Sequence, residues 1–183
     1  TIDLLPHDRE YFEAHLEFAK NYYEHVSNGA LTLNYRVLPE IYRVDQKMAR
    51  YSPTGQSFTN EPLAEFVRDV WQKVEQEGGF NTQGLDPENT AFVIFHAGVG
   101  RDLKLTGTSL KITPQDLPSI YLGQSQLDQL LNQFNGKGFP INDGQFYVSN
   151  SMIVPRTLSR PGTSFGNDFV FQLSINGLLT ASI

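Results

Sequence analysis

The residues best suited to chemistry lie together in the stretch Thr90–Asp102, which reads TAFVIFHAGVGRD. A β-prone apolar run ends at His96, passes through Gly98-Val99-Gly100 and closes on Arg101 and Asp102. A strand that leads into a glycine-rich loop can present backbone N–H groups to a phosphate. A histidine at a strand end can act as a general base or as a metal ligand. The spacing of these residues has to decide between such roles.

The spacing argues against a nucleotide site. A dinucleotide fingerprint needs a third glycine three residues after the second, but position 103 is Leu, and no Lys-Ser/Thr phosphate-loop pair is present. We therefore predict a tight turn after a central strand. Arg101 and Asp102 can pair with each other or with nearby backbone groups, and His96 can be a structural, hydrogen-bonded residue. A functional role for His96, Arg101 and Asp102 remains the alternative hypothesis.

Other catalytic and metal-binding patterns are absent from the sequence. The chain has no cysteine, which excludes disulfides, thiolate zinc sites and a cysteine nucleophile. The remaining histidines, His7, His15 and His25, have no partner at the i, i+4 spacing that would hold a metal on one helix. HExxH and the Gly-x-Ser-x-Gly nucleophile motif do not occur. The sequence therefore names no catalytic residue and no metal ligand.

Composition excludes two classes of partner. The 183 residues carry a net charge of −6. An acidic chain is not expected to bind nucleic acid or to dock on an anionic membrane. No apolar run is long enough to insert into a membrane.

The chain starts at Thr1 and ends on the apolar stretch FVFQLSINGLLTASI, and we expect it to be the N-terminal part of a longer polypeptide that continues past Ile183.

The periodicity of apolar residues predicts a single domain over residues 1–183, of the α/β (α+β) class. We expect Ala91–Phe95 to be a strand covered on both faces, and the last helix to be apolar all round and buried. In the first half of the chain we expect a helix over Asp8–Val26, a strand over Leu31–Val37, a helix capped by Asn60 with its apolar face over Leu63–Val74, and the strand Ala91–Phe95. In the second half we expect an irregular hairpin over Leu103–Thr113 and a short helix from Ser125 to Phe134, with Ser125 and Asp128 as capping pair. A strand over Gln145–Val154, a loop over Arg156–Gly166 and a final helix from Asn167 to Ile183 follow.

Several phrases, taken in order, resemble the immune inhibitor A-like secreted metallopeptidases. Tyr23, Ser27 and Gly29 form an aromatic-x-x-x-Ser-x-Gly phrase between the first helix and a strand. The stretch Phe95–Gly98 forms an (I/F)-H-x-G phrase at the end of a strand, and FYVSNSMIVPRT is similar to the strand and loop before the active-site helix. The resemblance implies a zincin-like twisted mixed sheet with two long helices and a buried C-terminal helix.

The zinc-binding motif of that family does not occur in the last helix. In the family this helix bears HExxH, in which two histidines bind zinc and the glutamate acts as base. Here Phe169–Ile183 contains neither His nor Glu, and Ala181 and Ser182 stand about where the first His and the Glu would be. The alternatives are a peptidase-like pseudoenzyme without catalytic zinc and an active zinc metallopeptidase whose HExxH lies beyond Ile183. The sequence contains no set of residues spaced as zinc ligands, which favours the pseudoenzyme without catalytic zinc.

We therefore expect a secreted, bacterial, metallopeptidase-like domain, extracellular or at the cell surface, that is not an enzyme in this chain. It would have no cofactor; only the alternative, an active metallopeptidase whose HExxH lies beyond Ile183, would bind zinc. Its role would be that of a binding or structural assembly module. The Tyr- and Phe-rich first helix and the apolar C-terminus would contact the remainder of the polypeptide or another chain, including a second copy in a homo-oligomer.

Overall fold

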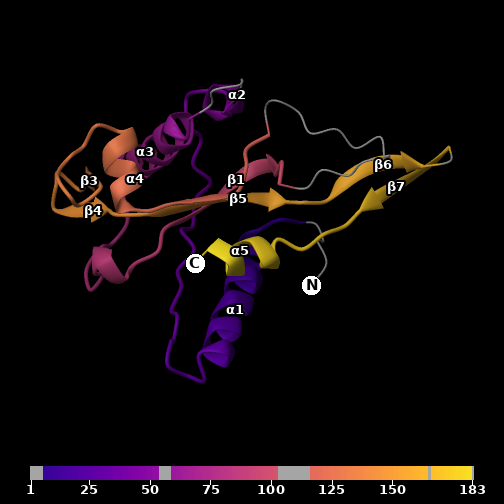
Figure 1. Ribbon diagram of the computed structural model, residues 1–183, viewed down its shortest axis with the longest axis horizontal. Helices are drawn as coiled ribbons and strands as arrows, with labels where there is room; N and C mark the ends of the chain where they lie inside the picture. Colours follow the sequence, from indigo (N-terminus) through magenta and orange to yellow (C-terminus); the bar gives the residue numbers. More distant parts are fainter. Residues whose placement is uncertain (1–5, 54–58, 103–115, 165, 183) are drawn as a thin grey trace.

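The computed structural model describes residues 6–53, 59–102, 116–164 and 166–182. It is a mixed α and β structure in which one small mixed sheet lies between helices (Figure 1). The helices are α1 (Arg9–Val26), α2 (Met48–Tyr51), α3 (Glu61–Gln76), α4 (Gln124–Leu130) and α5 (Asn176–Ser182), with a 3-10 turn at Pro87–Asn89; the strands are β1 (Val93–Val99), β2 (Ile120–Leu122), β3 (Phe139–Ile141), β4 (Phe146–Val148), β5 (Ser151–Thr157), β6 (Arg160–Ser164) and β7 (Asn167–Phe171).

The two long helices form where apolar periodicity and end signals agree. Asp8 caps α1, because its carboxylate accepts a hydrogen bond from the Tyr11 N–H at 3.1 Å. Pro62 lies in the first turn of α3, where its missing N–H costs little. Gly29 and Gly78 follow the two helices with positive φ angles, the left-handed conformation that ends many helices. The sequence prediction of both helices is confirmed, except that Asn60, at the start of α3, makes no side-chain capping hydrogen bond within the described chain.

The central sheet has the strand order β1-β5-β2. The β1 and β5 strands are parallel, with Ile94 opposite Ile153 and His96 opposite Pro155, whereas β2 runs antiparallel to β5. A parallel pair needs a crossover connection and is usually covered on both faces. Six of the seven β5 side chains are buried, with Arg156 the exception.

Two apolar clusters cover the two faces of this sheet. Alternate side chains point to opposite faces, so Phe92 and Ile94 join the cluster that α3 completes, whereas Val93 and Phe95 pack against the cluster built around α5. The α1 helix lies on the α5 side, where the Phe12 and Phe95 ring centroids are 4.8 Å apart. The expectation of a strand covered on both faces is therefore confirmed.

Two short ribbons extend the sheet at its ends. The β3–β4 pair lies beside α3 and α4, and the β6–β7 pair projects as a two-stranded arm from the other end of β5 (Figure 1). Among the described residues, no helix is long and apolar enough to cross a membrane.

The predicted strand over Leu31–Val37 is wrong for the described structure. Residues 30–38 carry no strand or helix assignment, and the chain returns from the far end of α1 toward α2 as a single segment (Figure 1). The alternation of apolar residues is present, but no neighbouring strand among the described residues pairs with it. A strand needs such a partner for its backbone hydrogen bonds.

Two predicted boundaries in the middle of the chain also need correction. The short helix is capped by Gly123, whose N–H donates to the Gln126 side chain at 3.0 Å, and not by Ser125. Asp128 is buried instead and accepts from the Gly138 N–H. The predicted strand over Gln145–Val154 is two strands, β4 and β5. The β5 strand continues through Pro155, which lies opposite His96 and has no N–H to donate to the ladder at that position.

The predicted end of the chain is wrong in its extent. The stretch Arg156–Gly166 contains the end of β5 and all of β6, and Asn167 begins β7 and not a helix. The apolar residues of β7 reflect strand pairing in a ribbon, where Val170 is 60% exposed. Only α5 is helical, with fully buried Ile175 just before it and fully buried Leu179 within it. The expectation of a helix that is buried all round is also wrong, because Gly177 and Ala181 are exposed. The predicted hairpin over Leu103–Thr113 lies outside the described residues.

Candidate functional site

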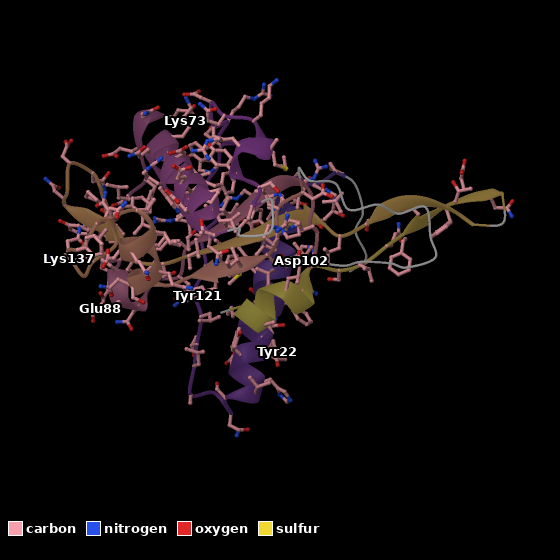
Figure 2. All side chains as sticks on the ribbon, turned by 45° about the horizontal axis from the view of Figure 1, so that its top comes forward. Tyr22, Lys73, Glu88, Asp102, Tyr121 and Lys137 are labelled. Atoms are coloured by element: carbon pink, nitrogen blue, oxygen red, sulfur yellow. The ribbon has the colours of Figure 1, made fainter. Side chains whose placement is uncertain are left out.

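The sequence-predicted site lies at the carboxyl end of β1. Because β1 and β5 are parallel, this end lies beside the carboxyl end of β5, the edge at which open α/β sheets usually bind ligands. The β1–β5 register shifts between His96 and Val99. Figure 2 labels Asp102 close to where the arm leaves the sheet.

His96 is a buried imidazole, with 3% of its surface exposed. Its Nδ1 lies 3.1 Å from the carbonyl oxygen of Ala97, so Nδ1 carries the proton when it donates to this group. Its Nε2 is buried and has no hydrogen-bond partner among the described residues. Burial lowers the pKa of His96, against the opposing effects of the Ala97 hydrogen bond and the carboxylates of Asp102 and Asp116. The ring is therefore a neutral base held inside the protein.

Arg101 ties β1 to the chain that follows α2. Its Nη1 donates to the carbonyl oxygen of Pro53 at 3.0 Å and lies 3.5 Å from the Ser52 hydroxyl. Its backbone N–H donates to the Leu117 carbonyl at 3.1 Å. The guanidinium is thus occupied by backbone and hydroxyl oxygens.

Asp102 ties the same turn to the start of β2. Its two carboxylate oxygens accept from the Ser119 N–H at 2.7 Å and from the Ser119 hydroxyl at 2.9 Å. Arg101 and Asp102 thus each bind neighbouring groups from other parts of the chain. These contacts are those that a turn-holding role requires.

The glycines of this turn allow close approach of the backbone. Gly98 has a φ of +106°, a conformation that side chains with a Cβ rarely adopt. A Cβ on Gly100 would lie 2.6 Å from the Asp102 Oδ2 and 2.7 Å from the Pro155 Cγ. The φ of Gly98 and the close packing at Gly100 therefore explain the two glycines. The predicted tight turn at Gly98-Val99-Gly100 is wrong in its position, because β1 continues through Gly98 to Val99 and the chain bends at Arg101 and Asp102.

The positions expected to correspond to the zinc motif lie in the last turn of α5. Ala181 and Ser182 end this helix, and Ala181 is exposed. The Tyr23 hydroxyl donates to the Thr180 carbonyl at 2.6 Å, which joins the end of α5 to α1. Within the described parts of the chain, no group of three His, Asp or Glu side chains converges as metal ligands do.

A second cluster of polar rings was missed by the sequence analysis. His7 stacks on Tyr11 with 4.3 Å between ring centroids, and His15 meets the other side of Tyr11 at 4.6 Å. The His15 Nδ1 lies 2.5 Å from Oδ1 of Asn176 in α5, and the Tyr11 hydroxyl donates to the Arg156 carbonyl. The i, i+4, i+8 spacing of His7, Tyr11 and His15 was the signal that could have revealed it. The cluster fastens α1 to β5 and α5.

An aromatic surface remains on the outer side of α1. Phe18 is 44% exposed and Tyr22 is 42% exposed, and their rings lie nearly parallel with centroids 6.4 Å apart. Figure 2 labels Tyr22 on this helix. Exposed neighbouring aromatic rings are typical of contact surfaces.

Comparison with models of known protein families, with curated protein sequences and with solved structures finds no match for this chain. The fold and the side-chain geometry therefore carry the functional argument.

Proposed function

We propose that the chain is a zincin-like, metallopeptidase-like domain of a secreted bacterial protein, and that it acts without catalytic zinc as a binding or assembly module. The family assignment rests on the order of the phrases quoted above. Its support from the described fold is coarse: two long helices, a mixed sheet and a C-terminal helix against one face of that sheet.

The observation that carries the proposal is the composition and packing of α5. This helix packs against α1 and β5, with buried Leu179 in the helix and buried Ile175 just before it. Its residues Asn176–Ser182 include no His, Asp or Glu. A zincin needs two histidines and a glutamate on such a helix to hold the metal and its water. An α5 of this composition serves as a structural element.

The state of the other polar residues is consistent with a non-catalytic role. His96 is buried, and Arg101 and Asp102 bind backbone and hydroxyl groups of their own chain. Two neighbouring exposed aromatic residues, Phe18 and Tyr22, lie on α1, outside the β1 turn. A module that binds another protein chain needs this kind of surface more than it needs a polar pocket.

The test is metal analysis and peptidase assay of the native full-length protein, purified without chelators. We expect far less than one zinc per chain by inductively coupled plasma mass spectrometry, and no hydrolysis of denatured casein with or without added zinc. About one bound zinc per chain, together with hydrolysis that a chelator abolishes, would overturn the proposal and favour the active metallopeptidase with HExxH beyond Ile183.

A further inference from the structure

The segment of residues 31–37, LTLNYRV, has the sequence of a strand but pairs with no other strand of the described chain. Its apolar residues alternate with polar ones, the period of a half-buried strand. In the described part of the chain, no backbone–backbone hydrogen bond involves residues 32–43. Such a row of open groups next to apolar side chains is a template for pairing with another strand.

Two side-chain contacts fix the orientation of this segment. On one side, the Tyr35 hydroxyl forms a hydrogen bond with the Glu17 carboxylate of α1, which raises the pKa of Tyr35. On the other side, Arg36 donates to the Asn81 carbonyl at 2.8 Å and lies over the Phe80 ring. In an extended strand successive side chains lie on opposite faces and the hydrogen-bonding edges lie between those faces, so the contacts of Tyr35 and Arg36 would leave both edges available.

The limits of the segment also define its centre. Asn28 and Gly29 turn the chain with positive φ angles just before it, and Pro39 cannot donate a ladder hydrogen bond just after it. Asn34 is the midpoint of residues 31–37. An antiparallel pair centred on Asn34 would use all seven residues of each strand.

We propose that two copies of this chain pair through residues 31–37 as antiparallel strands, with Asn34 opposite Asn34 on a two-fold axis. In this register Leu31 faces Val37 and Leu33 faces Tyr35, so apolar residues oppose apolar residues on one face. The inference rests on the proposed assembly role and names the partner as a second copy.

The charge pattern of the segment favours this self-pairing. Arg36 is its only charged residue, and in the register centred on Asn34 it faces Thr32. No like charges therefore oppose each other across the pair, although the whole chain has a net charge of −6. The apolar face of the new ribbon would lie on the Tyr35 side, toward α1.

The absence of cysteine allows a direct test of the register by single-cysteine variants of the full-length protein. Across a two-fold axis at position 34, the Cβ atoms of paired residues are about 4.5–5.5 Å apart. In the N34C variant this is close enough for a disulfide after modest adjustment. In the matched T32C variant the two sulfurs would be about 13 Å apart along the strands, too far for a disulfide. Both positions are exposed.

We expect mild oxidation to convert most N34C protein to a covalent dimer, at least about tenfold faster than T32C. We expect wild type to sediment as a dimer in analytical ultracentrifugation. The N34P variant lacks the N–H that each Asn34 donates to the opposite Asn34 carbonyl in a hydrogen-bonded pair, and it should dissociate at least about tenfold more readily. The N34A variant keeps this N–H and should remain dimeric. Circular dichroism of N34P should show the helix content of wild type, because residues 31–37 belong to no helix.

A wild-type monomer at every soluble concentration, dimerisation of N34P like that of wild type, or equal crosslinking of N34C and T32C would each overturn the proposal. A segment that pairs only with a different protein would give the first of these results. The zinc analysis separates the two proposals: a zinc-free monomer contradicts only the dimer, whereas a zinc-loaded dimer contradicts only the non-catalytic module.

Discussion

On one side of the β1–β5 pair, α3 completes a cluster of seventeen buried residues within the described chain; on the other, α1 and α5 cover a cluster of five. The larger cluster includes Trp71, Phe92 and Phe146, whose rings contact one another. The smaller one is supplemented by polar contacts, such as His15 with Asn176 and Tyr23 with Thr180. The α3 side is thus held mainly by apolar burial, and the α1–α5 side by fewer apolar groups and several directed hydrogen bonds.

This difference has a consequence for function. Apolar burial stabilises in proportion to the area removed from water, so the α3 side is expected to dominate the free energy of unfolding. The α1–α5 side carries the exposed rings of Phe18 and Tyr22, and Tyr35 of the segment of residues 31–37 contacts Glu17 of α1. Contact surfaces are commonly drawn from the less stable parts of a structure.

The largest effect is expected from loss of packing on the α3 side. Trp71 is 7% exposed and contacts Phe80 and Phe92, so Trp71→Ala should lower the free energy of unfolding by about 3–5 kcal/mol. Urea unfolding followed by circular dichroism measures this. Phe134→Ala is the control, because Phe134 is 79% exposed, and it should change stability by less than about 0.5 kcal/mol. Comparable losses for both variants would contradict the core assignment.

A smaller and more local effect is expected on the α1–α5 side. Leu179→Ala should cost about 2–3 kcal/mol, since Leu179 is fully buried but lies in a small cluster. Hydrogen exchange should show faster exchange in α1 and α5 while α3 stays protected. Uniform loss of protection in all three helices would show that the two sides unfold as one unit. It would contradict the lower stability expected for the α1–α5 side.

The turn at the end of β1 connects the two sides and should tolerate little added volume. Gly100→Ala would bring a Cβ within 2.7 Å of Pro155, so we expect a loss of about 1–3 kcal/mol. Gly177→Ala in α5 is the matched control, because open space surrounds that position, and it should stabilise by up to about 1 kcal/mol. Thermal unfolding of the two variants should therefore shift in opposite directions; a shift in the same direction would refute the close approach at Gly100.

The smallest effect concerns the pH dependence of stability. Burial lowers the pKa of His96 below its ordinary 6.5, so below that pH the unfolded chain binds a proton that the folded chain does not. The free energy of unfolding should then fall as pH decreases from about 6.5 toward the folded-state pKa. His96→Phe should reduce this slope, whereas exposed His25→Gln should not. Parallel pH profiles for wild type and His96→Phe would show that His96 does not contribute.

The sequence predicted the elements whose signals are local. Helix α1 has an Asp cap and a continuous apolar face, and α3 combines an N-terminal proline with six buried residues at helical spacing. The apolar run at Ala91–Phe95 indicated a strand covered on both faces, because such a run has no polar side to give to water. The neighbourhood of His96, Arg101 and Asp102 followed from their adjacency in sequence.

Tertiary structure decided what depends on a partner. Residues 31–37 have a strand pattern but no neighbouring strand within the described chain, and Asn167–Phe171 became a strand because Arg160–Ser164 lies beside it. The apolar pattern of a short segment does not distinguish a buried helix from a paired strand. The partners of Arg101 and Asp102, at Pro53 and Ser119, and the contact of His15 with Asn176 are distant in sequence, and only the folded chain brings these groups within hydrogen-bonding distance.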